Sequence, residues 1–201
     1  MIVDSVEVTL SGVVKIAMPD GSFFFLRQPY LQTTQISDFF VGAEFSQDDV
    51  HVLEALESTL CYTTEKKALD YLNRSEHSRF LLEQKLKAKK YGIPEIKAAL
   101  DYLEEEQLLS DKRYALAWLR TRRITKSEGR VRLASELASR GVEKKVIQDA
   151  LDEFFAEFDE DEILLKAIEK LNKKNLSYDE MVTALVKKGF PLTNIKKIYQ
   201  K

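Results

Sequence analysis

The sequence has little cysteine, proline or glycine, and it has no long apolar run. Its single cysteine, Cys61, excludes an internal disulfide and favours a reducing compartment. No window approaches eighteen uncharged apolar residues, and the opening MIVDSVEVTL lacks a basic segment followed by an apolar core. We therefore expect no membrane span, no secretion signal and a cytoplasmic protein.

The scarcity of glycine also excludes the common nucleotide-binding motifs. The seven glycines stand far apart, and no pair has the spacing of a P-loop or a dinucleotide-binding loop. No nucleophile elbow is present, and His51, His77 and Cys61 lack zinc-site spacing. The acidic runs at 104–106 and 159–162 are typical of solvated helix ends. We therefore predict a binding protein, not an enzyme, with no cofactor and no metal site.

The composition is that of a globular protein, and the charge is unevenly distributed. Of the 201 residues, 44% are hydrophobic and 32% charged, which is enough to build a core. Residues 1–60 hold nine acids and two bases, net −7, whereas residues 61–150 hold twenty bases and fourteen acids, net +6. Residues 151–201 hold nine bases and ten acids, net −1. The middle segment is therefore where an anionic partner is expected to bind.

The N-terminal segment, 1–62, has the pattern of a β-hairpin or small meander followed by a linker helix. Apolar Val6, Val8 and Leu10 alternate with polar residues, and MPDGS at 18–22 predicts a turn before three phenylalanines. Ser46 is the expected N-cap of a helix whose buried face carries Val50, Leu53 and Leu56.

From residue 63 onward the sequence predicts helices in a threefold repeat. Gly92, Gly141 and Gly189 recur at spacings of 49 and 48, each after one amphipathic run and before another. We expect each glycine to adopt the left-handed conformation that ends the second helix of its unit. A period of this size predicts tandem three-helix units at 63–109, 110–157 and 158–201. The segment TRRITKSEG predicts a longer basic connection in the second unit.

The second unit concentrates basic side chains between Trp118 and Gly141. Seven bases stand there against two acids, Glu128 and Glu136. Arginine on one face would suit phosphates or acidic protein loops, because its planar fork binds both in a bidentate manner. The alternative is a solvated face on which the two acids pair with Arg132 and Arg140 at i, i+4. Trp118 is more typical of a core residue than of a base-stacking platform.

Three stretches resemble the RecX family, the regulators of the RecA recombinase. LNRSEHSRFLLEQKL matches the family pattern at Arg74, Glu76, His77, Ser78, Arg79, Leu82, Lys85 and Leu86. SDKRYALAWLRTRR matches at Asp111, Arg113, Tyr114 and Ala115. EGRVRLASELASRGV matches at Gly129, Arg132, Leu133, Glu136, Leu137, Arg140 and Gly141. The similarity covers roughly residues 65 to 201.

The resemblance implies a fold, a partner and an activity. The fold is mainly α: three helix-turn-helix-like repeats in an elongated, curved array, preceded by the small β-hairpin module. The implied partner is RecA and its filament on single-stranded DNA, whose ATPase, growth and strand exchange are lowered in recombination, DNA repair and the SOS response. The candidate contact residues are basic: Arg74, Arg79, Lys85, Arg113, Arg120, Arg122, Arg123, Lys126, Arg130, Arg132 and Arg140.

Two other functions are compatible with the residues. The first is a sequence-independent DNA-binding protein, although a net charge of +6 predicts only weak direct binding. The second is a helical-repeat adaptor for an unrelated partner. We expect a monomer, and we expect charge reversal at Arg120, Arg122 and Arg123 to weaken filament binding more than changes in the third repeat.

Overall fold

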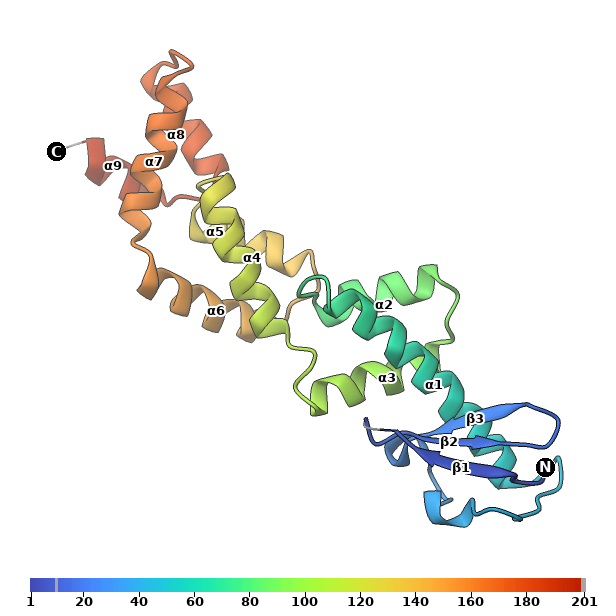
Figure 1. The fold of residues 1–201 in the computed structure, drawn as a ribbon. Helices are drawn as coiled ribbons and strands as arrows, with labels where there is room; N and C mark the ends of the chain where they lie inside the picture. The colour runs from blue at the N-terminus through green and yellow to red at the C-terminus, as the bar shows by residue number, and fades with distance from the viewer. Residues whose placement is uncertain (10, 200–201) are drawn as a thin grey trace. The chain divides into compact units, whose positions relative to one another are not determined.

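The computed structural model describes residues 1–9 and 11–199, and the chain folds as two compact units. Unit 1 consists of Met1–Ser75 and Leu82–Leu109, and unit 2 of Glu76–Leu81 and Ser110–Lys201. Unit 2 is mostly helical, whereas unit 1 combines helices with a three-stranded sheet (Figure 1). This confirms the predicted class, mainly α repeats after a small β module. The four-segment division stays a prediction. Within the described residues, no helix combines the length and apolarity needed to cross a membrane.

The N-terminal sheet is an antiparallel meander in the order β1-β2-β3. Val8 lies opposite Val14, and Val14 in turn lies opposite Leu26. The strands are β1 (Ser5–Val8), β2 (Val14–Ala17) and β3 (Phe23–Leu26), and they are followed by 3-10 turns at Gln28–Tyr30 and Ile36–Asp38.

The predicted MPDGS turn joins β2 to β3. The Met18 N–H donates to the Ser22 carbonyl (2.9 Å), and an oxygen of the Asp20 carboxylate accepts from the Ser22 N–H (2.9 Å). Gly21 has a φ of 84°, a left-handed conformation that glycine adopts without steric cost. The turn prediction is confirmed.

Most of the buried face of the sheet comes from β2 and β3, whereas on the predicted face of β1 Val6 is partly buried against the same core. Val14, Ile16 and Leu26 are buried, whereas Val8 is 75% exposed. Leu10, which was expected on the same face as Val8, lies outside the described residues. As the first strand of the sheet order, β1 pairs with one neighbouring strand only.

Helix α1 (Val50–Leu72) packs on β3 with an unexpected face. Its N-cap is Asp49, whose carboxylate accepts from the His51 N–H, so the prediction of Ser46 was wrong. The predicted core positions Val50, Leu53 and Leu56 are 46–52% exposed. The buried positions are largely polar or small: Glu54, Ala55, Ser58, Cys61, Tyr62, Thr64, Glu65 and Ala68. Polar partners in the N-terminal module explain this inversion, as described below.

Unit 1 continues through α3 (Ile93–Glu105), which packs on α1, and most of α2 (Arg79–Ala88). The second helix does not end as predicted, because Gly92 has a φ of −69° and is the N-cap of α3. Lys90 takes the left-handed conformation instead, with a φ of 66°. The true equivalent of Gly141 is therefore Lys90, two residues before the predicted glycine.

Unit 2 contains six helices around one continuous core. Gly141 and Gly189 have φ values of 75° and 89°, which confirms the two remaining glycine predictions. The core includes Leu119, Leu137, Phe154, Leu164 and Leu185. The helices are α4 (Asp111–Thr125), α5 (Arg130–Ala138), α6 (Lys144–Glu157), α7 (Glu160–Asn172), α8 (Tyr178–Lys187) and α9 (Leu192–Tyr199).

The same kind of hydrogen bond, from the first N–H of one helix to a carboxylate at the start of another, occurs twice in unit 2. The first N–H of α2, at Arg79, donates to the Asp111 carboxylate (2.8 Å). In the same way, the first N–H of α5, at Arg130, donates to the Glu160 carboxylate (3.2 Å). Both acceptors stand at the first residue of a following helix, where a carboxylate is also favoured by the helix dipole.

The start of α5 also requires a glycine. The Gly129 N–H donates to the Lys188 carbonyl at 2.9 Å. A Cβ on Gly129 would lie 2.6 Å from the carbonyl oxygen of Gly189, closer than side chains tolerate. The start of α5 is thus held directly against the end of α8 by backbone contact.

Candidate partner-binding surface

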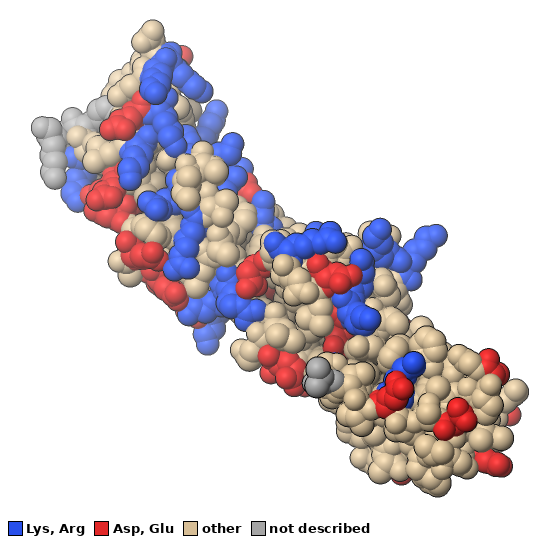
Figure 2. Space-filling view, viewed as in Figure 1, with Lys and Arg blue, Asp and Glu red and all other residues tan. Residues whose placement is uncertain are grey.

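The eleven predicted contact residues lie in both units. Arg74 and Lys85 belong to unit 1, where Lys85 lies 4.7 Å from the ring of Tyr71 and Arg74 is exposed. The other nine belong to unit 2. Figure 2 shows many Lys and Arg side chains over α5, α7 and α8 on the visible face of that unit. The geometry of unit 2 therefore decides which of the nine act together.

The expected long basic connection is mostly helix. Helix α4 continues to Thr125, so the segment between α4 and α5 is only residues 126–129. Arg120, Arg122 and Arg123 consequently project from a rigid helix, and their directions are set by the helical period.

Trp118 lies at the centre of an arginine cluster. Its ring is 5.2 Å from the guanidinium of Arg122 and 4.8 Å from that of Arg140, and the side chain is partly buried against the core. Arg140 and Arg132 both pair with the Glu136 carboxylate, at 2.8 and 2.5 Å. The hydrogen bond from Arg140, followed by the charge of Arg132, lowers the pKa of Glu136 below its ordinary value. We call these five residues the tryptophan cluster.

The predicted i, i+4 pair between Glu128 and Arg132 is wrong. Glu128 does not bind Arg132, because Glu128 precedes the start of α5 and the two residues do not share a helix. Instead it accepts two hydrogen bonds from Arg122, at 2.9 and 3.0 Å, in the bidentate fork geometry. Both side chains are largely buried, with 21% and 11% exposed. Arg122 therefore binds the segment 126–129 to α4 through Glu128.

Three further arginines form exposed ion pairs across helices. All three guanidinium groups meet carboxylates from other elements of unit 2, at 2.6–2.9 Å. Arg130 additionally lies 4.8 Å from the ring of Phe155. Exposed pairs of this kind contribute little to stability, typically about 0–1 kcal/mol. The pairs are Arg113–Glu76, Arg120–Glu157 and Arg130–Asp152.

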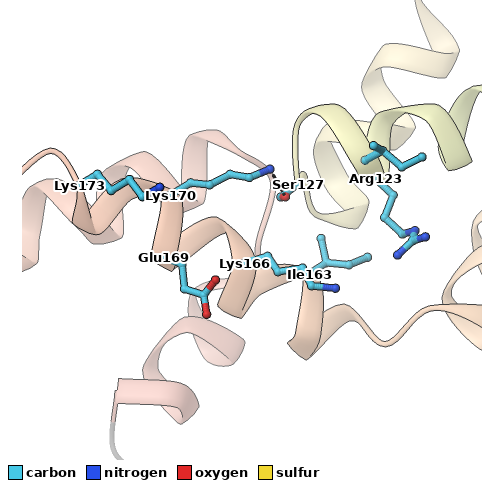
Figure 3. A pocket seen from close by; sticks show the side chains of 8 residues that line it. Arg123, Ser127, Ile163, Lys166, Glu169, Lys170 and Lys173 are labelled. Carbon is cyan, nitrogen blue, oxygen red and sulfur yellow. Dashed lines mark hydrogen bonds between the residues drawn. The ribbon is translucent and has the colours of Figure 1, made fainter.

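A second basic group, on α7 and its C-cap, was not predicted from the sequence. Lys166, Lys170 and Lys173 from α7 line a pocket with Arg123 and Ser127 (Figure 3). The signal was present as lysines at i, i+4 and i+7, but only the structure shows that they meet a predicted arginine. Among the described residues, no group of three or more His, Cys, Asp or Glu side chains has the geometry to hold a metal ion.

Family models match the chain in two places. Residues 66–103 match the first three-helix domain of RecX, and residues 110–151 match the second. A regulatory protein RecX from Treponema pallidum is 33% identical over 130 residues, which cover 65% of this chain and 79% of that protein. The chain belongs to the RecX family. A regulatory protein RecX from Vibrio vulnificus is 31% identical over 136 residues, which cover 64% of this chain and 86% of that protein.

Solved structures extend the likeness to the whole fold. A crystal structure of regulatory protein RecX superposes with a TM-score of 0.76 at 21% identity, covering 99% of this chain and 98% of the other. RecX from Lactobacillus salivarius superposes with a TM-score of 0.61 at 25% identity, covering 70% of this chain and 95% of the other. The third repeat, which the two family models do not reach, is thus part of a RecX-like fold.

Proposed function

We propose that this chain is a non-enzymatic regulator of the RecA recombinase. It binds RecA and the RecA filament on single-stranded DNA, and it lowers ATP hydrolysis, filament growth and strand exchange in recombination and repair. The observation that supports this most directly is membership of the RecX family, whose matched members are named regulatory proteins. A monomer acting in the cytoplasm fits this role.

The surface arginines of unit 2 are suited to contact a protein partner. Arg113, Arg120 and Arg130 are paired with exposed carboxylates, and such pairs exchange partners at little cost in stability. A carboxylate from RecA that took the place of Glu157 beside Arg120 would keep the bidentate geometry available to arginine. The surface is therefore ready for an acidic protein loop without refolding.

The repeated helical units supply a second physical reason. A RecA filament presents identical protomers along its length, and linked weak sites bind such a polymer with an affinity that exceeds each site alone. Three similar units on one chain therefore favour the filament over free RecA. This predicts inhibition at fewer than one chain per RecA protomer.

The test is RecA ATP hydrolysis on single-stranded DNA while this protein is titrated in. We expect strong inhibition well below one chain per protomer, because a chain that spans protomers or caps a growing end affects many others. If inhibition begins only when the protein saturates the DNA, competition for the strand explains it and the RecA proposal is wrong.

A charge-reversed pair locates the contact. Arg122 is tied to Glu128, so its reversal would disturb the fold; Arg113 and Arg120 are exposed and serve better. We expect Arg113→Glu/Arg120→Glu to need at least several times more protein for the same inhibition. Lys144→Glu/Lys145→Glu, at exposed positions in α6, is the matched control because it changes the net charge equally. Equal losses in both variants would show that only net charge matters.

A further inference from the structure

A pocket of about 380 Å³ lies between the end of α4 and the side of α7 in unit 2. Figure 3 shows the side chain of Arg123 entering from α4 and those of Lys166, Lys170 and Lys173 from α7. The ammonium of Lys170 donates to the hydroxyl of Ser127, 3.0 Å away. Four cationic side chains from two helices therefore surround one opening.

The charge of the α7 lysines is not neutralised within the protein. Among the described residues, no ion pair joins Lys166, Lys170 or Lys173 to a carboxylate. Glu169 is the single acid among the pocket-lining residues. This differs from the arginines of α4 and α5 described above, each of which has a carboxylate partner except Arg123.

Other lysines add to the positive potential around the pocket. The ammonium of Lys188 lies 3.0 Å from the Lys126 carbonyl. Burial lowers the pKa of Lys188, and the charges of Lys170, Lys126 and Lys174 lower it further against the opposing effect of Glu128. A group of like charges packed this closely attracts an anion.

Arg123 shows that the pocket is held ready for such a ligand. Its guanidinium lies 4.0 Å from the ring of Phe158, which fixes the side chain by a cation–π contact. Its Nε is buried and has no hydrogen-bond partner among the described residues. A buried donor without a partner is costly unless a ligand or solvent satisfies it.

The arrangement favours a chain of phosphates over a single anion or a carboxylate. Lys166, Lys170 and Lys173 follow one another by four and three residues, so they are separated by about 6 Å and about 4.5 Å along the α7 axis. Lysine binds phosphate as a point charge, without the planar match that arginine offers a carboxylate. Ile124, which is 73% exposed at the pocket edge, offers apolar contact for a sugar or base.

We propose that this pocket and the row of lysines on α7 bind consecutive phosphates of a single nucleic-acid strand. The third repeat thus carries a nucleic-acid contact of its own. The inference goes beyond the RecA partnership and does not depend on it, because the strand is bound directly.

The test is fluorescence anisotropy of a short labelled oligothymidylate with the full chain, measured over a range of salt concentrations. The variant is Lys166→Gln/Lys173→Gln, which keeps the bond between Lys170 and Ser127. The matched control is Lys144→Gln/Lys145→Gln, another exposed lysine pair. Each phosphate contact contributes about 0.7 to the slope of log affinity against log salt for single strands. We expect the α7 variant to lose about 1.4 of that slope and at least several-fold in affinity, and the control to lose little.

Two results would overturn the proposal. One is an equal loss in both variants, which would mean that only net charge matters. The other is displacement of the oligonucleotide by inorganic phosphate at the same phosphate concentration as unlabelled strand, which would mean that the pocket takes a free anion. The same variants in the RecA assay separate the two proposals: the α7 variant fails in strand binding, whereas Arg113→Glu/Arg120→Glu fails in inhibition.

Discussion

Arg27 in unit 1 and Arg123 in unit 2 share two features of their guanidinium groups, but they differ in the side chains around them. Both guanidinium groups lie on aromatic rings, Arg27 at 4.4 Å from Tyr102 and Arg123 at 4.0 Å from Phe158. Both have a buried Nε without a hydrogen-bond partner among the described residues. They differ in what the terminal nitrogens meet, and that difference separates a structural arginine from one available to a ligand.

The terminal nitrogens of Arg27 are bound by other side chains and backbone of unit 1. It donates to the Glu65 carboxylate (2.9 Å), to the Tyr102 hydroxyl (2.5 Å) and to the Ser11 carbonyl (3.1 Å). Glu65 also accepts from the Tyr30 hydroxyl (2.9 Å), and burial raises the pKa of this carboxyl against those bonds. These contacts join Arg27, the residue that follows β3, to α1 and α3. They explain why α1 buries polar residues and exposes its leucines.

Removing the two arginine charges should therefore have very different costs. Arg27→Met leaves Glu65 buried without its cation, and breaking a buried pair typically costs about 3–5 kcal/mol. We expect urea unfolding of unit 1 to show this loss. The double variant Arg27→Met/Glu65→Leu should recover much of it, because it leaves no unpaired charge. A loss below about 1 kcal/mol in the single variant would mean that this pair does not hold the module.

Glu54 is a second buried charge in unit 1, and it too is held by hydrogen bonds within the fold. Its carboxylate accepts from the N–H groups of Gln32, Thr33 and Thr34. Burial alone would raise the pKa of Glu54, but the bonds from Thr33 and Thr34 outweigh it and lower the pKa from 4.5 to about 2. The stabilisation is then fully present above about pH 5 and is lost as the pH falls toward 2.

We expect Glu54→Gln to cost about 2 kcal/mol at neutral pH, since bonds to a charged acceptor are lost. The variant should also lose less stability than the wild type between pH 5 and pH 2. Chemical unfolding at several pH values measures both effects. If the free energy of unfolding depended on pH in the same way in both proteins, Glu54 would not contribute to the acid sensitivity.

Sequence patterns revealed local features of this molecule better than long-range ones. The MPDGS turn, the glycines at 141 and 189 and the Glu136–Arg140 pair each depend on neighbours within a few residues, and each was predicted. Arg27 and Glu65 are 38 residues apart, and no periodicity links them. Gly92 was wrongly predicted to end the second helix of the first repeat. Lys90 takes that position instead, in a left-handed backbone conformation that residues other than glycine seldom adopt.

The candidate site was predicted in the same uneven way. The arginines between Trp118 and Gly141 were visible in the sequence, but the partners of Arg120 and Arg130 come from another helix, α6. The lysines of α7 were equally visible, and what distinguishes them is the lack of such partners in the described structure. A missing partner cannot be seen in a sequence, because it is a property of the packed helices.

For the tryptophan cluster we expect a much smaller loss of stability than for the buried charges of unit 1. Glu136→Gln would leave Arg132 and Arg140 unpaired at a partly exposed site, and we expect a loss of about 0.5 kcal/mol in urea unfolding. Because the pKa of Glu136 is lowered, its contribution is present above the unfolded pKa and is lost as the pH falls through the folded value. A loss above about 2 kcal/mol would place this cluster with the buried charges of unit 1.

The smallest stability effect should come from Arg123→Met, the direct counterpart of Arg27→Met. The methionine keeps apolar contact with Phe158, no carboxylate loses its cation, and a positive charge beside the pocket lysines is removed. We therefore expect a change below about 0.5 kcal/mol, the low end of the range for a cation–π contact at an accessible site. Binding of the labelled oligothymidylate should nevertheless weaken by at least the loss of one phosphate contact in the salt slope, about 0.7. A variant that is destabilised but still binds the strand would make Arg123 a structural arginine like Arg27, because its charge would then serve the fold and not the ligand.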